Sequence, residues 1–462
     1  MANLIQLKRP AGRLFDLAME ATCLMRKAGM QTFWVGGAPR DIFLGRTPGD
    51  VDMVTTGRPE DIKVLFPDSD MVGACFGVTL VKYKGVVFEV ATCRKERSYG
   101  DGRHPSEIKF TDDFEADLRR RDFTCNALLY DPESEMLTDC VNGIEDLRNG
   151  VLRVVGDARE RFAEDYLRMF RAVRFAAVLD LKLDKALSDA LGDMHSLTRV
   201  LAPERVREEL EKMLCSAAPV RALKLLKSSG LLKVWLPEVD ALAGVAQHKL
   251  YHPEGDVWQH TLLMFEKLEA PADVFLAWSM LLHDIGKKSA FSVGQDGIPH
   301  FYCHEAMGGD MVRAIAERLR FSKRLQDAVE HAVRNHMRFA FVREMRQSKL
   351  KRLLAEEFFD MELELHRLDC LASNGLMGTW AFLHDLCMHQ PQTSLPEGLI
   401  NGHDLMRMGY KSGPQFKTML AAAMDAQLEG AFADKAGAEK WVKENFNRVT
   451  TQNGSSCRNA EE

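Results

Sequence analysis

The sequence predicts an α+β chain, with a small head of mixed sheet and helices followed by an all-helical remainder. Over about the first 140 residues, short β-like runs alternate with turns and helical stretches. From about Arg153 onward the β pattern fades, and apolar residues recur at three- and four-residue spacing, as on helix faces. A chain of 462 residues is too long for one core, so about two to four domains are expected.

The strands of the head are expected from local patterns. The run "FWVGG", from Phe33, is a candidate buried strand, and "DVDMVT", from Asp50, alternates polar and apolar residues. The run "VTLVKYKGVVFEVAT", Val78 to Thr92, predicts a β-hairpin with Lys84-Gly85 at its turn. Beyond the head, "RFAEDYLRMFRAVRFAAVL" and "PERVREELEKMLCS" each predict a helix.

Helix-breaking residues divide the chain into five predicted segments. Pro237, Pro253 and the run "HQPQTSLPEG" mark breaks, and the final "TTQNGSSCRNAEE" is polar. The predicted boundaries are 1–145 for the head, 146–235 for a helical neck, 236–390 for a second helical domain, 391–450 for a helical tail and 451–462 for a disordered C-terminus.

The composition predicts a cytosolic protein with no membrane partner. No run of about 18 apolar residues is present, and the N-terminus "MANLIQLKRPAGRLFD" lacks the apolar core of a signal peptide. The ten cysteines form no CxxC pair, which favours reduced thiols over disulfides or a zinc site. A net charge of −6 leaves no general basic footprint, so RNA contacts depend on local patches such as Arg119-Arg120-Arg121.

Two aspartates, Asp50 and Asp52, stand one residue apart in a candidate strand, where residues i and i+2 point to the same side. Carboxylates held this close repel one another unless a cation lies between them. Magnesium suits such a site, because it takes oxygen ligands and is commonly shared between carboxylates and substrate phosphates. Upstream, Gly36 and Gly37 allow the backbone to approach a phosphate, and Arg40 supplies positive charge. Both patterns also occur in turns and on surfaces without any catalytic role.

A third carboxylate, Glu89, lies in the second strand of the predicted hairpin, in "VVFEVAT". Alternation places it on the side of Val87 and Ala91, a side that is not clearly solvent-facing. A carboxylate on a largely apolar strand needs a partner, and a metal shared with Asp50 and Asp52 would be one. Two metals that clamp an attacking and a leaving oxygen are used by polymerases and nucleases. The alternative is that Glu89 simply faces solvent.

These motifs follow one another in an order that resembles a known family. "GGAPRD…LGRTPGDVDMVT" is similar to the Gly-Gly and DxD signature of the polymerase-β-like nucleotidyltransferases. "DLRRRDFTCNALLYD" resembles the RRDFTxNA motif of the bacterial-type (class II) tRNA nucleotidyltransferases, or CCA-adding enzymes, and the bacterial poly(A) polymerases. "VNGIEDL" supplies the family's Gly-x-x-Asp-Leu, and "RFAEDYLRMFRAVRFA" its EDxxR helix. The resemblance spans about Phe33 to Leu214, with Pro39 where the family usually has valine.

The resemblance implies a two-metal site for nucleotidyl transfer, with Asp50, Asp52 and Glu89 as catalytic residues and Asp50 and Asp52 as ligands of Mg²⁺. It assigns nucleotide binding to Gly36, Gly37, Arg40, Arg121, Asp122, Asn126, Asp165, Arg168 and Arg171. The run from Thr92 to Phe110 resembles the family's flexible loop, which is associated with switching from C to A addition.

Asp165 and Arg168 are expected to read the base. Three residues apart on a helix, they are neighbours on one face. An aspartate accepts a hydrogen bond from an exocyclic amino group, and an arginine donates to a ring nitrogen or carbonyl. Cytosine and adenine both offer an amino group beside an acceptor, so the pair could select CTP and ATP without a nucleic-acid template. An isolated pair of this kind is usually a solvent-exposed ion pair of little consequence.

The second half of the chain is rich in histidine. Its order of His260, His283-Asp284 and Asp369 resembles the HD metal-dependent phosphohydrolase superfamily, and His304 and His336 would suit a dinuclear variant. The resemblance implies a divalent transition metal that activates water against a phosphate ester. HD domains also occur as inert scaffolds or RNA platforms.

We therefore expect a polymerase-β-like nucleotidyltransferase head, an all-α neck, an HD-type helical domain and a helical tail. The expected activity is addition of C, A or both to the 3′ end of tRNA from CTP and ATP, with an HD phosphohydrolase as a second activity. A poly(A) polymerase or an A-adding specialist is the alternative within the family. An HD-type nucleotide phosphohydrolase and a non-catalytic RNA-binding protein are alternatives from other classes.

Overall fold

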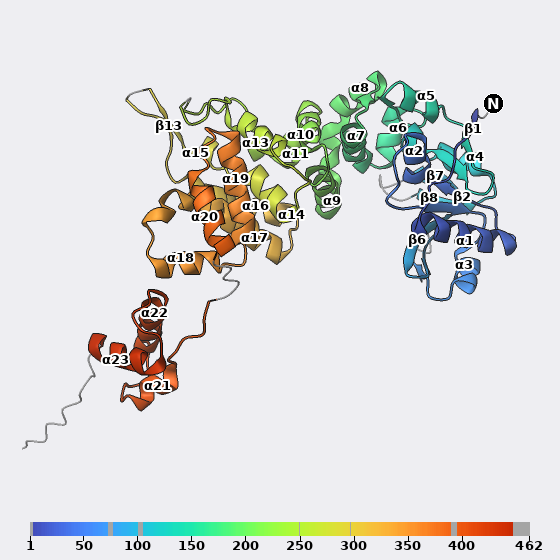
Figure 1. Cartoon of the computed structure of the whole chain (residues 1–462). Coiled ribbons are helices and arrows are strands. Elements are labelled where there is room, and N and C mark those ends of the chain that lie inside the picture. Colours follow the sequence, from blue (N-terminus) through green and yellow to red (C-terminus); the bar gives the residue numbers. More distant parts are fainter. Residues whose placement is uncertain are drawn as a thin grey trace, which may run out of the picture. The chain divides into compact units, whose positions relative to one another are not determined.

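A computed structural model describes residues 3–72, 77–99, 105–248, 250–295, 297–389 and 395–446. The chain forms two compact units (Figure 1). The first comprises Met1–Val245, Leu268–Ala277 and Arg313–Ser322, and the second comprises Ala246–Lys267, Trp278–Val312 and Lys323–Glu462. The predicted disordered C-terminus, 451–462, lies outside the described residues.

The first unit is built on an eight-stranded mixed sheet with the order β1-β10-β9-β2-β3-β6-β5-β4. The β3–β6 ladder is parallel, and the other ladders of this sheet are antiparallel. Its strands are β1 (Asn3–Gln6), β2 (Thr32–Val35), β3 (Asp52–Thr55), β4 (Asp70–Met71), β5 (Val78–Tyr83), β6 (Val86–Thr92), β9 (Leu128–Asp131) and β10 (Met136–Asp139). The predicted mixed sheet and the β5–β6 hairpin are both confirmed.

Helices cover this sheet. α1 and α3 pack on it and against each other (Figure 1). The helices of the head are α1 (Arg13–Lys27), α2 (Gly37–Phe43), α3 (Pro59–Leu65), α4 (Phe114–Arg119), the 3₁₀ turn η2 (Thr124–Asn126) and α5 (Gly143–Arg148). Two short ladders lie outside the main sheet: β7 (Arg94–Tyr99) with β8 (Pro105–Phe110), and β11 (Val151–Leu152) with β12 (Lys182–Leu183). The predicted flexible loop falls on β7, on β8 and on residues 100–104, which are outside the described residues.

Trp34 of β2 anchors the packing of α1 on the sheet. Its side chain is fully buried, and its ring lies 6.4 Å from that of Phe15 and 5.6 Å from that of Tyr130. The indole N–H donates to the Thr22 hydroxyl at 3.1 Å, so its one polar atom is satisfied inside the core. The strand "FWVGG" is therefore a buried central strand, as its composition predicts.

The neck is organised around α7 (Leu167–Val178), which contacts α9 (Pro203–Leu214) and α10 (Pro219–Ser228). Arg174 of α7 donates to the buried Glu209 of α9 at 2.7 Å. The remaining helices of this part are α6 (Ala158–Glu164), α8 (Lys185–Met194), η3 (His195–Val200), α11 (Leu231–Trp235) and α12 (Pro237–Asp240). The helix predicted from "PERVREELEKMLCS" is confirmed as α9.

The single helix predicted from Arg161 to Leu179 is wrong. α6 ends at Glu164, Asp165 is extended with φ −153° and ψ 108°, and α7 begins at Leu167. The Asp165 carboxylate accepts a hydrogen bond from the Leu167 N–H at 3.0 Å. A short acidic side chain that bonds to nearby backbone competes with the helical ladder, which is the physical reason for the break.

The second unit is mainly helical (Figure 1). Helices α13 and α19 contact each other, and so do α19 and α20. Its helices, some of which extend into the first unit, are α13 (Val257–Glu266), α14 (Val274–Leu282), α15 (Lys287–Ala290), α16 (His304–Arg318), α17 (Lys323–Asn335), η4 (Arg338–Glu344), α18 (Gln347–Leu354), α19 (Phe359–Ala372) and α20 (Gly378–His389). A short hairpin, β13 (Phe291–Val293) with β14 (Pro299–Phe301), joins α15 to α16.

Three further helices, α21 (Gly402–Arg407), α22 (Gln415–Leu428) and α23 (Lys435–Asn445), share a small core that includes Leu405, Met419 and Val442. Polar contacts connect α22 and its C-terminal end to α18. Arg352 donates to Asp425 at 2.8 Å, and the Ser348 N–H donates to Glu429 at 2.7 Å.

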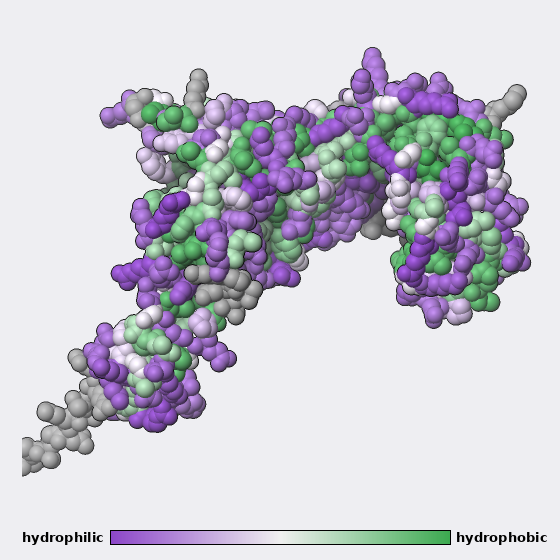
Figure 2. Space-filling model, viewed as in Figure 1, coloured by the Kyte–Doolittle hydropathy of each residue, from purple (hydrophilic) through white to green (hydrophobic). Residues whose placement is uncertain are grey.

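Hydrophilic residues are spread over the visible face, with apolar patches between them (Figure 2). No helix among the described residues has the length and apolar character that crossing a membrane requires. The cysteines within the described part of the chain are free thiols: Cys23, Cys93, Cys125, Cys140, Cys215, Cys303, Cys370 and Cys387.

The "GIEDL" motif connects α5 to η2. A Cβ at Gly143 would lie 2.1 Å from the Thr124 carbonyl oxygen, so only glycine permits this approach. Three residues later, Asp146 accepts from the Thr124 hydroxyl at 2.7 Å and from Arg153 at 3.1 Å. The motif therefore holds the segment "RRDFTCNA" against α5.

Replacing Gly143 by alanine should destabilise the first unit by about 1–3 kcal/mol, because the added methyl group meets a backbone oxygen that has no rotamer to change. Gly192 of α8 is the matched control, since a methyl group added there would meet no neighbouring atom within 4 Å. Gly192→Ala should therefore stabilise by about 0.5–1 kcal/mol. Urea unfolding midpoints measure both effects. Equal midpoints for Gly143→Ala and the natural chain would contradict the close approach of Gly143 to Thr124.

Candidate active sites

Three carboxylates meet at one end of the β3–β6 ladder. Asp52 is the first residue of β3, and the register that pairs Met53 with Val90 brings Glu89 of β6 beside it. Burial raises the pKa of Asp52 to about 6, with further contributions from the charges of Glu89 and Asp50. The three acidic side chains therefore interact electrostatically, as a shared cation site requires.

The structure corrects two expectations about these carboxylates. Asp50 precedes β3, so its position depends on the turn before the strand and not on strand alternation. Glu89 and Val87 are both exposed, while Phe88 and Val90 are buried. The argument that Glu89 lies on a largely apolar face is therefore wrong, and its place in the cluster follows from the parallel pairing of β3 and β6.

Gly36 brings the backbone close to the carboxylates. Its φ of 72° and ψ of −125° turn the chain sharply between β2 and α2. A Cβ at Gly36 would lie 3.1 Å from Asp52 Oδ2, and one at Gly37 would lie 4.0 Å from Asp50 Oδ1. The glycine pair thus leaves space beside the carboxylates for a ligand.

The side chain of Arg40, in α2, extends beside this glycine pair. It donates to Asn126 Oδ1 at 2.7 Å and to Asp41 at 2.8 Å. These two contacts fix the guanidinium of Arg40, a residue that is only 9% exposed. Two residues that the sequence predicts for nucleotide binding, Arg40 and Asn126, are therefore in direct contact.

A second pair of predicted residues, Asp122 and Arg171, also lies together. Arg171 Nε donates to Asp122 Oδ2 at 2.8 Å, and the Phe123 N–H donates to Oδ1 at 2.8 Å. Burial raises the pKa of Asp122, but the Arg171 charge outweighs it and leaves the pKa below the ordinary value. Both carboxylate oxygens are engaged, so Asp122 positions Arg171. Arg121 Nη2 lies 3.4 Å from Oδ2 of the buried Asp117.

Sequence reasoning missed a ring at the centre of these arginines. Phe175 of α7 lies under three guanidinium groups, at 5.7 Å from Arg40, 5.4 Å from Arg171 and 4.2 Å from Arg174. Cation–π attraction offsets part of the repulsion among these charges. Phe175 follows the EDxxR motif at helical spacing, which resembles an ordinary core position.

The two predicted base-reading residues do not pair with each other. Arg205 of α9 donates to both oxygens of Asp165, at 2.7 and 3.3 Å. Arg168 donates to the Glu164 carboxylate and to the Arg161 carbonyl. Both side chains remain partly exposed, at 19% and 13%. Arg205 was not predicted, because nothing in the sequence indicates that α9 reaches Asp165.

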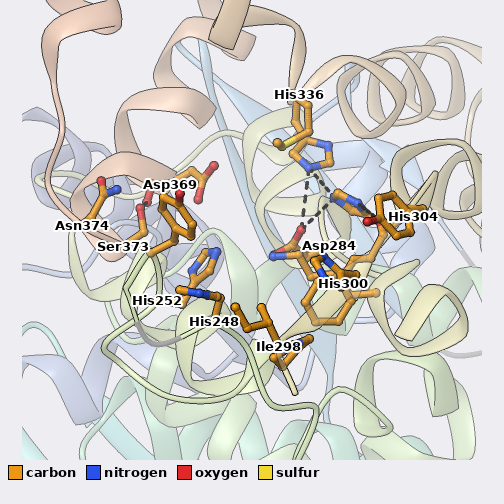
Figure 3. Close-up of a pocket in the computed structure, with 16 residues that line it drawn as sticks. His248, His252, Asp284, Ile298, His300, His304, His336, Asp369, Ser373 and Asn374 are labelled. Atoms are coloured by element: carbon orange, nitrogen blue, oxygen red, sulfur yellow. Dashed lines mark hydrogen bonds and ion pairs between the residues drawn. The ribbon is translucent and has the colours of Figure 1, made fainter. Parts of the chain in front are cut away.

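The histidines of the second unit form a separate site around Asp284. His283, His304 and His336 each direct Nδ1 at a backbone carbonyl three residues earlier, at 3.0, 2.9 and 2.8 Å. Their Nε2 atoms therefore face Asp284, at 3.1, 3.6 and 3.7 Å from its oxygens. Figure 3 shows this arrangement for His304 and His336. A backbone contact that fixes one ring nitrogen and aims the other is typical of metal-binding histidines.

His260 and Asp369 make the second half of this site. His260 Nε2 lies 3.1 Å from Asp369 Oδ1, while Nδ1 lies 2.6 Å from Glu254, which also contacts His252 at 2.9 Å. All six predicted HD residues thus lie in one site. His252 and Glu254 were missed, because they stand in a loop that lacks any helical pattern.

The charges of the site suit cation binding. Burial lowers the pKa of His336 to about 4, so this ring is neutral at pH 7. Burial raises the pKa of Asp284, but the charges of His283 and Lys287 outweigh this effect and hold the pKa well below its usual range. Burial lowers the pKa of His260, yet Asp369 and Glu254 raise it more, to about 9, so without a metal this ring carries a proton that a bound cation would replace.

The donor set fits a divalent transition metal. Two groups of His and Asp side chains, His260-His283-Asp284 and Asp284-His304-His336, have ligand atoms within 4.8 Å of one another and share Asp284. The buried Nε2 atoms of His260 and His283 make no hydrogen bond of normal geometry, although each lies 3.1 Å from a carboxylate oxygen. Imidazole nitrogens that face carboxylates without bonding to them suit a cation between the two.

An open cavity of about 640 Å³ adjoins this centre. Lys287 lies in its wall and donates to Asp284 at 2.7 Å and to Gln247 at 2.7 Å. The cavity therefore gives a small molecule access to Asp284, His304 and His336.

Three family models match separate parts of this chain. Residues 32–153 match the "Poly A polymerase head domain", residues 180–242 the "Probable RNA and SrmB- binding site of polymerase A", and residues 252–357 the "HD domain". The last of these includes five of the six predicted HD-site residues, and Asp369 lies beyond its end.

Curated relatives of this chain include CCA-adding enzymes. The CCA-adding enzyme of Lactobacillus helveticus is 42% identical over 43% of this chain, which spans only half the length of that relative. The CCA-adding enzyme of Geobacillus sp. (strain WCH70) is 34% identical over 58% of this chain and 67% of that relative.

A solved structure extends the likeness over nearly the whole chain. The CCA-adding enzyme of Bacillus stearothermophilus, solved in complex with CTP, superposes with a TM-score of 0.73 at 26% identity. The superposition covers 94% of this chain and 98% of that one. By the motifs, the fold and these relatives together, the chain belongs to the family of CCA-adding enzymes, tRNA nucleotidyltransferases that share their head domain with the poly(A) polymerases.

Proposed function

We propose that this protein extends the 3′ end of tRNA with C and A, using CTP and ATP and no nucleic-acid template. The observation that carries the proposal is the cluster of Asp50, Asp52 and Glu89 at one end of the β3–β6 ladder, where burial, followed by the like charges of Glu89 and Asp50, raises the pKa of Asp52. The CTP complex of the B. stearothermophilus relative supports the choice of nucleotide. The predicted functional segments, 1–145, 146–235, 236–390 and 391–450, remain part of this proposal.

In the head, Asp50 and Asp52 would hold Mg²⁺, with Glu89 as the third carboxylate. Bound there, two such ions supply charge stabilisation at the attacking 3′ oxygen and the leaving pyrophosphate oxygen. Gly36 and Gly37 leave room for the triphosphate beside the carboxylates. Arg40, fixed by Asp41 and Asn126, and Arg171, fixed by Asp122, supply positive charge to the phosphates, and Arg121 adds to it.

Asp165 and Arg168 are proposed to read the base. In the structure each makes contacts that a base would replace: Asp165 with Arg205, and Arg168 with Glu164. The Asp165 carboxylate, which accepts from Arg205 in the structure, can equally accept from the amino group of cytosine or adenine. Uracil and guanine present no amino group beside an acceptor in the same order, so they would face an unpaired donor and acceptor.

For the second unit we propose a metal-dependent phosphohydrolase. His260, His283, Asp284 and Asp369, with His304 and His336, would hold a divalent transition metal, or two that share Asp284. Such a metal lowers the pKa of bound water and so supplies a nucleophile at neutral pH. Lys287, fixed between Asp284 and Gln247, places a positive charge at the cavity wall where a phosphate would bind.

A tRNA transcript that ends at the discriminator base tests the head. With CTP and ATP together, we expect addition of C, C and A followed by arrest, and no use of UTP or GTP. Asp50→Ala and Asp52→Ala should each lower the rate about 1,000-fold or more, since several kcal/mol of charge stabilisation are lost. Asp68→Ala, an exposed carboxylate of the same head, is the matched control and should act normally.

Sequencing gels distinguish the alternatives in that experiment. An unlimited ladder of A would mean a poly(A) polymerase, and a single A on tRNA already ending in CC would mean an A-adding specialist. Full activity in Asp52→Ala would contradict the proposed site.

The crowding of the carboxylates also predicts an effect on the thermal stability of the first unit when no metal is bound. A folded-state pKa of about 6 for Asp52, against an ordinary value of 3.8, means that its ionised form is disfavoured in the folded protein. In EDTA at pH 8, Asp52→Asn should therefore raise the thermal midpoint of the first unit by a few degrees. The gain should shrink as the pH falls through about 6 and vanish below about 4, because both states then carry the proton.

Differential scanning calorimetry at several pH values measures this effect. Asp68→Asn serves as the control, since Asp68 is an exposed carboxylate outside the cluster of Asp50, Asp52 and Glu89. A gain of equal size at pH 4 and pH 8 would show that charge crowding is not its cause.

Hydrolysis of p-nitrophenyl phosphate and its bis ester tests the second unit. Chelation should abolish the activity, Mn²⁺, Co²⁺ or Ni²⁺ should restore it, and Asp284→Asn should lower it at least about 100-fold. His403→Ala, an exposed histidine of α21, is the control for loss of an imidazole elsewhere in the unit. Nucleotide addition should be unchanged in both variants. Activity that persists in Asp284→Asn would assign the hydrolysis to another site.

A further inference from the structure

We propose that Phe175 is a positioning residue for the nucleotide triphosphate, because its ring gathers the guanidinium groups of Arg40 and Arg171 at the place where the phosphates would bind. The inference rests on the proposed nucleotidyl transfer and deepens it, since it assigns phosphate affinity to a side chain that has no polar atom. Phe175 lies in α7 and is only 9% exposed, so it must act through the groups that pack around it.

Arg174 supports the ring from the neck. Its Cζ lies 4.2 Å from the centroid of the Phe175 ring, closer than the guanidinium groups of Arg40 and Arg171. The same guanidinium donates through Nε to Glu209 at 2.7 Å, and Glu209 is buried in α9. Because the buried carboxylate engages this charge, Arg174 serves as a fixed support for the ring.

Phe123 contacts the ring from the head. The Phe123 side chain is fully buried, and its ring meets that of Phe175 edge to face, with centroids 5.6 Å apart and planes at 71°. This geometry is favourable for two aromatic rings. Phe123 lies between Asp122 and Asn126, the two side chains that contact the proposed phosphate-binding arginines. The ring therefore packs against the segment that orients both guanidinium groups.

Two cations from different helices meet at this ring. Arg40, of α2, has its Cζ 5.7 Å from the ring centroid, and Arg171, one turn before Phe175 in α7, has its Cζ 5.4 Å away. Both distances lie within the range of about 6 Å over which an aromatic face attracts a cation. The Phe175 ring thus attracts toward one point two positive charges that would otherwise repel each other.

The chemistry of the ring matters here beyond its volume. An aliphatic side chain could fill the same space, but it has no negative face to attract a guanidinium group. Arg40 is only 9% exposed, and electrostatic attraction is stronger where little water competes. Loss of the π face alone should therefore let the two guanidinium groups separate while the surrounding core remains folded.

This role predicts a particular pattern of substrate affinity. The triphosphate is the same in CTP and ATP, whereas the base is assigned to Asp165 and Arg168. A change at Phe175 should therefore weaken both nucleotides by the same factor and leave the choice between them unchanged. A residue that acts on base recognition would instead alter the ratio of the two affinities.

The test compares the full chain with Phe175→Leu, with Phe175→Tyr and with a protein in which Phe175 is replaced by pentafluorophenylalanine. Fluorination keeps nearly the same ring shape but removes the negative charge of its face, so it separates cation attraction from packing. Phe170 is the matched control, because it is a buried phenylalanine of the same helix whose ring packs against Trp235 at 6.3 Å. It receives the leucine and pentafluorophenylalanine replacements, and thermal midpoints establish that each variant is folded.

Two measurements are made on each protein. The first gives KM and kcat for CTP and for ATP on tRNA. The second gives the affinity for inorganic tripolyphosphate in Mg²⁺ by titration calorimetry, because this ligand carries no base and requires no tRNA. Tripolyphosphate bound elsewhere on the chain contributes equally in every variant, so differences among the Phe175 proteins report on the head.

We expect Phe175→Leu and the pentafluorophenylalanine protein to raise KM for CTP and ATP equally, about tenfold, and to weaken tripolyphosphate binding to a similar extent. The value of kcat should stay within about threefold, and KM for tRNA should not change. Phe175→Tyr should retain the natural values, and the Phe170 replacements should leave them unchanged. Natural affinities in the pentafluorophenylalanine protein, or unequal effects on CTP and ATP, would overturn the inference.

Failure of the proposed function gives a different result. If the natural chain adds no nucleotide to tRNA, the nucleotidyl transfer is wrong, and tripolyphosphate binding alone decides the role of Phe175. Binding that fluorination weakens and Phe175→Tyr retains would still support it. Binding that is absent from the natural chain, or that does not depend on the ring, would overturn it.

Discussion

The head depends on electrostatic repulsion that the protein itself relieves only in part. Burial and the charges of Glu89 and Asp50 raise the pKa of Asp52 to about 6, and the charge of Arg121 offsets part of this effect. Arg40 contacts Asp41 and Asn126, and Arg171 contacts Asp122. Arg40 and Arg171 are thereby placed for phosphates, while their guanidinium groups are bound to other side chains. A metal ion is the partner that completes this arrangement.

The second unit orients its candidate metal ligands in a different way. Its histidines are aimed by backbone carbonyls within their own chain segments, so each ring is oriented before any metal arrives. Asp284 is the single carboxylate that several Nε2 atoms face. Such a preformed donor set lowers the conformational cost of binding an ion. The carboxylates of the head depend instead on strand pairing and on one tight glycine turn.

Much of this could be predicted from the sequence, and the failures have physical causes. Local patterns located β2, β3, the β5–β6 hairpin, α9 and the change from a mixed head to a helical remainder, and ordered motifs drew attention to Asp52, Arg40 and the HD residues. The break at Asp165 was missed because apolar spacing continues across it, while a single side chain to backbone hydrogen bond ends the helix. Arg205, Glu254 and Phe175 were missed because their roles depend on which segments meet in space. No spacing rule contains that information.

The parallel pairing of β3 and β6 constrains how this sequence can change in length. Glu89 reaches Asp52 only because β6 runs beside β3 in one register, and side chains along a strand alternate between its faces. An insertion at the Lys84-Gly85 turn does not change the register between β3 and β6. A single residue inserted between Val86 and Glu89 would turn the carboxylate toward the core. Length variation among relatives that keep the activity should therefore concentrate at the turn and be excluded from these few positions of the strand.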